Sequence, residues 1–222
     1  MIFEENHNDS GRTNLLKGYN MLLYFSGSLI MYEPTEECVM DFFSDGLLKK
    51  LPISSSNPRF ISAASLLRES CTSKDACRAD LIRDHRRLFA PDGMRLAIPL
   101  ESEYNVVQRN HDASKPVREF YDSYGWNPRP GDNVPDDHLG KEVLFLTKLI
   151  DKYLQLDDKP CCREMKKEIQ RFIGQHLIPW LGIWNEKVQE NSMSAYYKGV
   201  GNLVLACAED LYGIFGDQNR LL

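Results

Sequence analysis

One short stretch of the chain concentrates residue types that can bind a metal ion or transfer a proton. Residues 134–142 read VPDDHLGKE, with two aspartates, a histidine and a glutamate close together. At a spacing of four residues, the side chains of His138 and Glu142 would share one helix face, as metal ligands can. With His85 or His176 as a further ligand, this set indicates one interpretation: a metal-dependent hydrolase.

The same stretch also has a structural interpretation. Asp136 or Asp137 can serve as the N-cap of a helix over residues 138–154, which is worth about 1 kcal/mol. In this interpretation His138 caps or packs at the helix start and Glu142 faces solvent. The chain has no Gly-x-Ser-x-Gly element, no Cys/His signature and no phosphate-binding glycine loop, and these are the usual marks of nucleophilic or nucleotide chemistry. The absence of these marks disfavours nucleophilic and nucleotide chemistry, we expect no cofactor, and the metal-dependent hydrolase stays the alternative to a protein that is not an enzyme.

The bulk composition excludes several classes of protein. The chain has 222 residues, of which 42% are hydrophobic and 27% are charged, as in an ordinary globular protein. A formal charge of −5 does not favour a nucleic-acid partner. The N-terminus is acidic and polar, unlike a secretory signal. The six cysteines show no CxxC pair and no zinc spacing, which is typical of a reduced cytoplasmic protein.

Helical periodicity runs through almost the whole sequence. Thr13 and the Asn57-Pro58 pair resemble helix starts, while Pro34 ends the first apolar periodic run. Two segments, 90–101 and 126–136, interrupt the periodicity with prolines and glycines. The sequence therefore predicts an all-α bundle of roughly ten helices, with residues 1–222 as a single domain and two irregular loops that form a groove.

Four pieces of the sequence, taken in order, resemble the motifs of the TorD/DmsD family of redox enzyme maturation chaperones. The pieces are Arg87-Leu88-Phe89 with Pro99-Leu100-Glu101-Ser102-Glu103-Tyr104, Pro135-Asp136-Asp137-His138-Leu139-Gly140-Lys141-Glu142, Phe172 with His176-Leu177 and Trp180, and Tyr196-Tyr197. The resemblance covers about residues 85–215 in order and spacing. The N-terminal third agrees only as a helical region.

The resemblance implies a function that residue spacing alone does not. Members of the family are all-helical cytoplasmic chaperones of molybdopterin-containing respiratory oxidoreductases. They bind the twin-arginine signal peptide or the apoenzyme, aid cofactor insertion and delay export until the enzyme is mature. Some members are proposed to bind guanine nucleotide weakly. We expect this chain to be a monomer, or a dimer swapped through the loop at residues 126–136.

The resemblance also implies which residues line a peptide groove. They are Leu88, Phe89, Pro99, Leu100, Glu101, Ser102 and Tyr104 on one side, and Pro135, Asp136, Asp137 and His138 on the other. Carboxylates of this set, together with Glu103, can bind the paired guanidinium groups through charge-assisted hydrogen bonds. Apolar residues of the first loop, such as Met94 and Ile98, can cover the apolar run of the peptide.

Overall fold

The computed structural model describes residues 2–35, 51–70, 74–104, 114–127 and 133–216. Within these ranges the chain forms nine helices and no strand apart from one isolated bridge. The helices are α1 (Ile2–Met31), α3 (Pro58–Glu69), α4 (Lys74–Leu88), α5 (Glu101–Tyr104), α6 (Lys115–Ser123), α7 (Leu139–Leu154), α8 (Lys159–His176), α9 (Ile178–Asn191) and α10 (Ala195–Gly216). The predicted all-α class is confirmed. None of these helices is long and apolar enough to cross a membrane.

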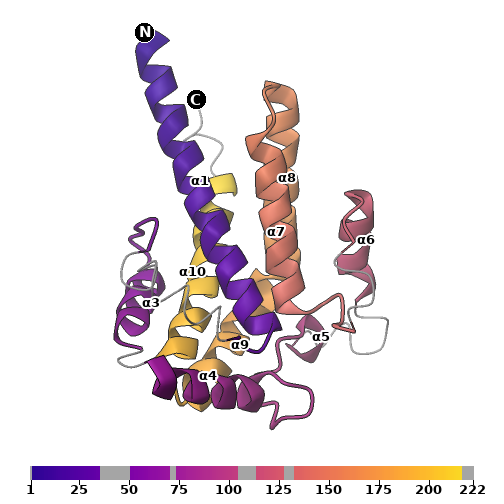
Figure 1. Cartoon of the computed structure of the whole chain (residues 1–222). Coiled ribbons are helices and arrows are strands. Elements are labelled where there is room, and N and C mark those ends of the chain that lie inside the picture. Colours follow the sequence, from indigo (N-terminus) through magenta and orange to yellow (C-terminus); the bar gives the residue numbers. More distant parts are fainter. Residues whose placement is uncertain (1, 36–50, 71–73, 105–113, 128–132, 217–222) are drawn as a thin grey trace.

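Helix α10 forms the centre of the bundle. It packs against α1, α3, α8 and α9, while α7 packs against α1 and α8. Most faces of α10 are buried, and its buried side chains include Tyr197, Val200, Val204 and Leu211. Figure 1 shows α1 rising beside α10 and the α7–α8 pair, with α4 lying across one end. The core thus runs along α10 and ends near α4, α5 and α9.

Local sequence signals account for several helix boundaries. Asn57 caps α3 by accepting a hydrogen bond from the backbone amide of Arg59 at 2.9 Å, as its sequence predicts. Helix α1 ends at Met31, just before Pro34. The predicted start at Thr13 is wrong, because α1 already begins at Ile2 and Thr13 lies inside it. No proline stands between residues 2 and 31 to stop the helix.

Two glycines allow α1 and α7 to approach each other closely. A Cβ atom on Gly140 would lie 2.8 Å from the carbonyl oxygen of Gly27 and 2.9 Å from Cβ of Met31. A Cβ atom on Gly27 would lie 2.5 Å from a methyl group of Val143. Any larger residue at either position would force the helices apart. The first turn of α7 is therefore held against α1.

Aromatic rings fill the space between α6 and the α7–α8 pair, whose ribbons lie apart in Figure 1. Phe120 meets Phe172 of α8 edge-on, with 5.3 Å between ring centroids. Tyr121 and Trp126 lie 4.8 and 5.3 Å from the Phe145 ring of α7. Such ring pairs contribute beyond their buried area. Helix α6 is therefore fixed to the bundle by rings rather than by close backbone packing.

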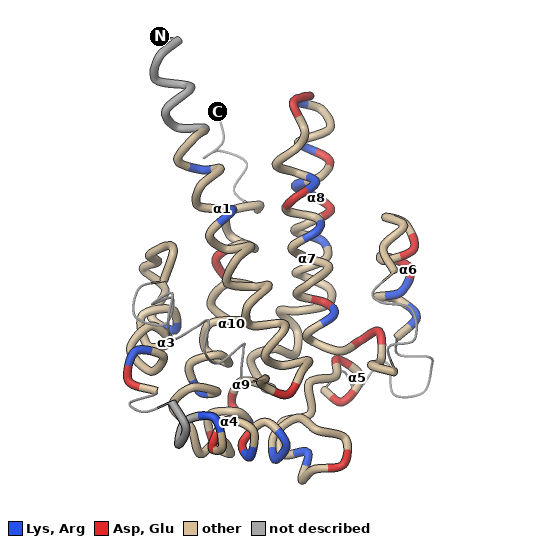
Figure 2. The backbone as a smooth tube through the Cα atoms, viewed as in Figure 1, with Lys and Arg blue, Asp and Glu red and all other residues tan. Residues whose placement is uncertain are grey.

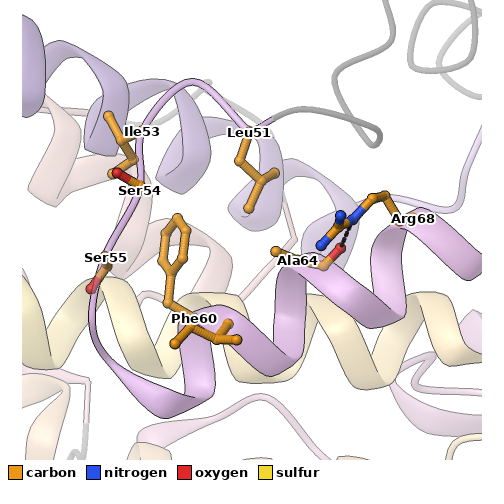
Figure 3. A pocket seen from close by; sticks show the side chains of 8 residues that line it. Leu51, Ile53, Ser54, Ser55, Phe60, Ala64 and Arg68 are labelled. Atoms are coloured by element: carbon orange, nitrogen blue, oxygen red, sulfur yellow. Dashed lines mark hydrogen bonds between the residues drawn. The ribbon is translucent and has the colours of Figure 1, made fainter.

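A hollow of about 250 Å³ lies between α3 and residues 51–55, as shown in Figure 3. Leu51, Ile53 and Phe60 make much of its wall apolar, and Arg68 stands at its edge. None of the residues implied in peptide binding lines this hollow. It is separate from the two irregular segments.

Candidate functional site

The end of the first irregular segment meets the residues that directly follow the second one, in an isolated antiparallel bridge that pairs Leu100 with His138. Beside this pair, the backbone amide of Glu101 donates to the carbonyl oxygen of Asp137 at 3.0 Å. We call residues 99–102 and 135–139 together the α5–α7 junction. Figure 2 shows acidic positions on α5, close to the chain that leads into α7. The expected proximity of the two segments is confirmed for this part, while residues 128–132 lie outside the described chain.

Helices α4 and α9 bind the first irregular segment, residues 90–101, through hydrogen bonds. The amides of Leu96 and Ala97 donate to the carbonyl oxygens of Arg87 and Leu88, at 3.3 and 3.0 Å. The carbonyl oxygen of Ala97 accepts a hydrogen bond from the indole Nε1 of Trp184 at 3.2 Å. These contacts satisfy backbone groups that no helix or sheet could satisfy. The irregular segment is therefore ordered and has a fixed path towards α5.

Leu88 and Phe89 belong to the core rather than to the surface. Leu88 is fully buried, and Phe89 is 7% exposed. The ring of Phe89 stacks on Trp184 at 6.1 Å and meets Tyr197 edge-on at 5.4 Å. These two implied groove residues pack inside the core and present almost no surface to a ligand.

Asp137 connects α5, α6 and α7 although it is only 2% exposed. Its carboxylate accepts hydrogen bonds from the backbone amide of Ser102 at 3.1 Å and from the hydroxyl of Ser114 at 2.9 Å. Ser102 lies in the first turn of α5, and Ser114 immediately precedes α6. Sequence reasoning did not identify Ser114 as a partner, because it stands 23 residues away.

Asp136 has a different environment and keeps 27% of its side-chain surface accessible. Its carboxylate pairs with Arg118 at 2.8 Å and, more loosely, with Lys141 at 3.5 Å. Its backbone carbonyl accepts from the hydroxyl of Tyr121 at 2.9 Å. These three partners were not predicted. The only sequence signal was the presence of Lys141 in the same charged stretch.

His138 is the N-cap of α7, which confirms the alternative that this histidine caps the helix, whereas the assignment of the cap to Asp136 or Asp137 is wrong. The Nδ1 atom of His138 accepts a hydrogen bond from the backbone amide of Gly140 at 3.0 Å. His138 has the extended backbone that an N-cap requires, with φ −79° and ψ 129°. Both aspartates precede the turn, and their carboxylates are taken by partners on α5, α6 and α7.

Three buried polar side chains, Glu101, Glu142 and His176, lie beneath the junction. Oε2 of Glu101 is 2.9 Å from Nδ1 of His176, and both side chains are enclosed. Glu142 is also fully buried, so the expectation that it faces solvent is wrong. Burial, followed by the nearby charges of Glu101 and Asp137, raises the pKa of Glu142 well above its ordinary value. The carbonyl oxygen of His176 accepts from Trp180 Nε1 at 2.5 Å.

This arrangement does not support the hydrolase interpretation. In the described part of the chain, no three histidine, cysteine or acidic side chains are placed to hold a metal ion. Nδ1 of His138 is used by the helix cap. His85 is buried among the rings of Phe89 and Tyr197, and burial lowers its pKa.

The implied groove residues thus fall into two groups. Those with accessible surface are Leu100, Ser102, Tyr104, Pro135 and Asp136. Those that are buried are Leu88, Phe89, Pro99, Glu101, Asp137 and His138. Tyr104 stacks on Trp180 at 5.5 Å between ring centroids. Glu103 is also exposed on α5, so accessible acidic and apolar groups lie on the same short segment.

Comparisons with known proteins bear on the family of this chain. A family model described as "Nitrate reductase delta subunit" matches residues 58–186. The chain is similar to "Chaperone protein TorD" of Aliivibrio salmonicida (strain LFI1238), with 24% identity over 85% of this chain and 90% of that protein. It is similar to the protein of the same name from Photobacterium profundum, with 22% identity over 89% of this chain and 94% of that protein.

A third relative, "Chaperone protein TorD" of Actinobacillus pleuropneumoniae serotype 3 (strain JL03), is 28% identical over 60% of this chain and 63% of that protein. The family model spans more than half of the chain, including α3 to α8 and most of α9. The chain therefore belongs to the TorD/DmsD family, a family of chaperones rather than enzymes, whose model is described as the nitrate reductase delta subunit.

Proposed function

We propose that this protein is a cytoplasmic chaperone for a molybdopterin-containing respiratory oxidoreductase. It binds the twin-arginine signal peptide or the apo form of that enzyme, aids cofactor insertion and delays export until the enzyme is mature. The observation that carries the proposal is the α5–α7 junction, where two segments with the family motifs meet.

The accessible residues of the junction, together with Glu103 and Tyr104 that follow it on α5, are the proposed peptide contacts. Leu100, Tyr104 and Pro135 offer apolar surface to the apolar run of a signal peptide. Asp136 and Glu103 are the proposed partners of the paired arginines, because their carboxylates retain access to solvent. A guanidinium group binds a carboxylate through a charge-assisted and often bidentate hydrogen bond.

The buried residues have a positioning role in this proposal. Glu101 and Asp137 are engaged inside the fold by His176, Ser102 and Ser114. Moving either carboxylate to the surface would expose a hydrogen-bonding group of the core and leave its partner unpaired. Their contribution to peptide binding is therefore to fix the backbone that carries the accessible residues.

Fluorescence anisotropy with a labelled peptide tests the proposal. The peptide carries two adjacent arginines followed by an apolar run, and a second peptide has lysines in their place. We expect saturable binding that is tighter for the arginine peptide and weakens as salt concentration rises. Absence of binding to either peptide, and to the apoenzyme that carries it, would contradict the proposal.

Two variants test the proposed arginine partners. Asp136→Asn and Glu103→Gln should each weaken binding roughly tenfold, since a hydrogen bond to a charged group is worth about 1.5–3 kcal/mol. Glu164→Gln is the matched control, because Glu164 is exposed on α8 and pairs only with Lys167 among the described residues. Equal affinity in all three variants would remove Asp136 and Glu103 from the site.

The same preparation tests the remaining expectations. Titration with GTP and GDP measures guanine-nucleotide binding, which we propose to be weak. Light scattering distinguishes the proposed monomer from a domain-swapped dimer, with a dimer fraction that grows with protein concentration.

A further inference from the structure

Two carboxyl groups face each other in the interior directly beneath the α5–α7 junction. Glu101 begins α5 and Glu142 lies in the first turn of α7, and both residues have no exposed surface. Oε2 of Glu101 meets His176. Oε1 of Glu101 and both oxygens of Glu142 are buried, and no hydrogen-bond donor among the described residues reaches them. Three orphan oxygens in one place need a physical explanation.

One proton shared between the two groups removes most of this difficulty. Ionised carboxylates are acceptors only, so two of them cannot form a hydrogen bond with each other. Two like charges at close range in a dry interior also cannot both persist. A neutral Glu142 has one O–H, and donation of that hydrogen to Oε1 of Glu101 pairs one oxygen of each group.

Among the residues that the structure describes, the other charged and titratable groups around the pair supply no competing partner. Asp137, on the chain that leads into α7, adds negative charge near Glu142. His176 on α8 is engaged with the far oxygen of Glu101. The hydroxyl of Tyr121 on α6 donates to the carbonyl of Asp136, and its own pKa is raised by burial. Lys141 points to the carbonyl of Val134 at 2.5 Å.

We propose that Glu142 carries a proton at neutral pH and donates it in a hydrogen bond to Glu101, and so acts as a positioning residue for the peptide-binding site. The bond joins the first turn of α7 to the start of α5. It therefore sets the position of Leu100 and Ser102, which flank Glu101 and are partly accessible. The link to peptide binding rests on the proposed function, whereas the proton itself does not.

The pH dependence follows from the direction of the shift. Burial raises the pKa of Glu142 in the folded state above that in the unfolded chain. The folded state therefore binds the proton more tightly, and the stabilisation is complete below the ordinary glutamate pKa. It is lost as pH rises towards the raised pKa. Across that window, the unfolding equilibrium constant grows up to about tenfold per pH unit from this group.

Two substitutions distinguish the effect of the hydrogen-bond donor at position 142 from the effect of filling the space there. Glu142→Gln keeps a neutral donor towards Glu101, whereas Glu142→Leu fills the space without one. Infrared spectroscopy of the protein without peptide should show the carbonyl stretch of a buried protonated carboxyl group, and Glu142→Gln should remove it. Urea unfolding at pH 5 to 9 should show a smaller loss of stability with rising pH in Glu142→Gln than in the wild type.

Peptide anisotropy over the same pH range completes the test. Wild-type affinity should fall at alkaline pH, Glu142→Gln should hold its affinity, and Glu142→Leu should bind at least fivefold more weakly at pH 7. An unchanged infrared band or an unchanged pH slope in Glu142→Gln would overturn the inference, and this comparison stands even if Glu142→Leu fails to fold. A confirmed proton with no peptide binding would contradict only the proposed function.

Discussion

The carboxylate of Asp137 accepts a hydrogen bond from the backbone amide of Ser102 at 3.1 Å, across a sequence separation of 35 residues. Ser102 lies in the first turn of a helix that has only four residues, and the amides of a first turn have no partner within their own helix. A buried carboxylate at this end satisfies one of them and complements its positive partial charge. Asp137 thus caps α5 from the segment that leads into α7.

Replacing Asp137 should therefore destabilise the fold as well as any bound state. Asp137→Ala leaves the Ser102 amide and the Ser114 hydroxyl unpaired, at an expected cost of about 2–4 kcal/mol in the free energy of unfolding. Asp137→Asn should cost clearly less. Its carbonyl oxygen can accept from Ser102 while its amide donates to the Ser114 hydroxyl, which can also accept.

Urea unfolding followed by circular dichroism measures both variants. Asp122→Ala is the control, because Asp122 is exposed on α6 and surface changes of this kind usually stay within about 0.5 kcal/mol. If Asp137→Ala unfolds at the same urea concentration as that control, Asp137 does not hold α5 in place.

The glycine pair between α1 and α7 gives a second prediction. In Gly140→Ala the new Cβ atom would lie 2.8 Å from a backbone oxygen of Gly27, and backbone cannot move aside as a side chain can. We expect a loss of about 1–3 kcal/mol, the usual cost of overpacking. Gly182→Ala on α9 has nothing within 4 Å and should be neutral or more stable by up to about 1 kcal/mol.

Thermal unfolding of the two glycine variants side by side decides between a packing effect and a helix-propensity effect. Both substitutions are in helices and both remove a glycine. A gain in stability at Gly140 similar to the gain at Gly182 would mean that α1 and α7 do not need their close approach.

Sequence reasoning succeeds where a signal is local. Asn57 and Asp158 are N-caps, and a proline stands at the first or second helical position after each of them. Each side chain accepts a hydrogen bond from a backbone amide in the first turn of its helix. The small residue Gly199 lets α10 approach α3 closely, since a Cβ atom there would lie 2.8 Å from Leu67. These features depend on neighbouring residues, or on the absence of a side chain, so they can be identified without a fold.

The candidate site shows where that reasoning fails. Glu142 resembles a solvated residue on a helix surface, yet it is fully buried. Its environment is made by the chain just before α7 and by α5, and α5 comes from a distant part of the sequence. Likewise, the partners of the two aspartates, Ser102 and Ser114 for Asp137 and Arg118 for Asp136, were not identified from the sequence. Partners of this kind become known only when the segments have been brought together.

The cap of α7 gives a third prediction. His138→Asn should retain most of the stability, since asparagine is a strong N-cap residue, whereas His138→Ala should lose about 1 kcal/mol. A metal site predicts a different outcome, in which both substitutions abolish metal binding. Measurement of unfolding free energies together with elemental analysis of the purified variants separates the two. A stoichiometric metal that disappears in His138→Asn would overturn the capping role.

Asp84 provides a last prediction, at the start of α10. It precedes His85 on α4 and is 2% exposed. Its carboxylate accepts hydrogen bonds from the hydroxyls of Ser192 and Ser194, both at 2.7 Å, and from the amide of Ser194 at 2.9 Å. One side chain of α4 thus holds the turn between α9 and the central helix.

Asp84→Ala should therefore cost about 3–5 kcal/mol, because a buried charged acceptor is lost and several donors are left unpaired. Asp84→Asn should lie between this variant and the wild type. Asp80→Ala, on the same helix, removes an exposed pair with Arg83, which should change stability by less than about 1 kcal/mol. Hydrogen exchange should show faster exchange at residues 192–197 in Asp84→Ala and no change in Asp80→Ala. Equal exchange in the two variants would mean that α10 begins without help from α4.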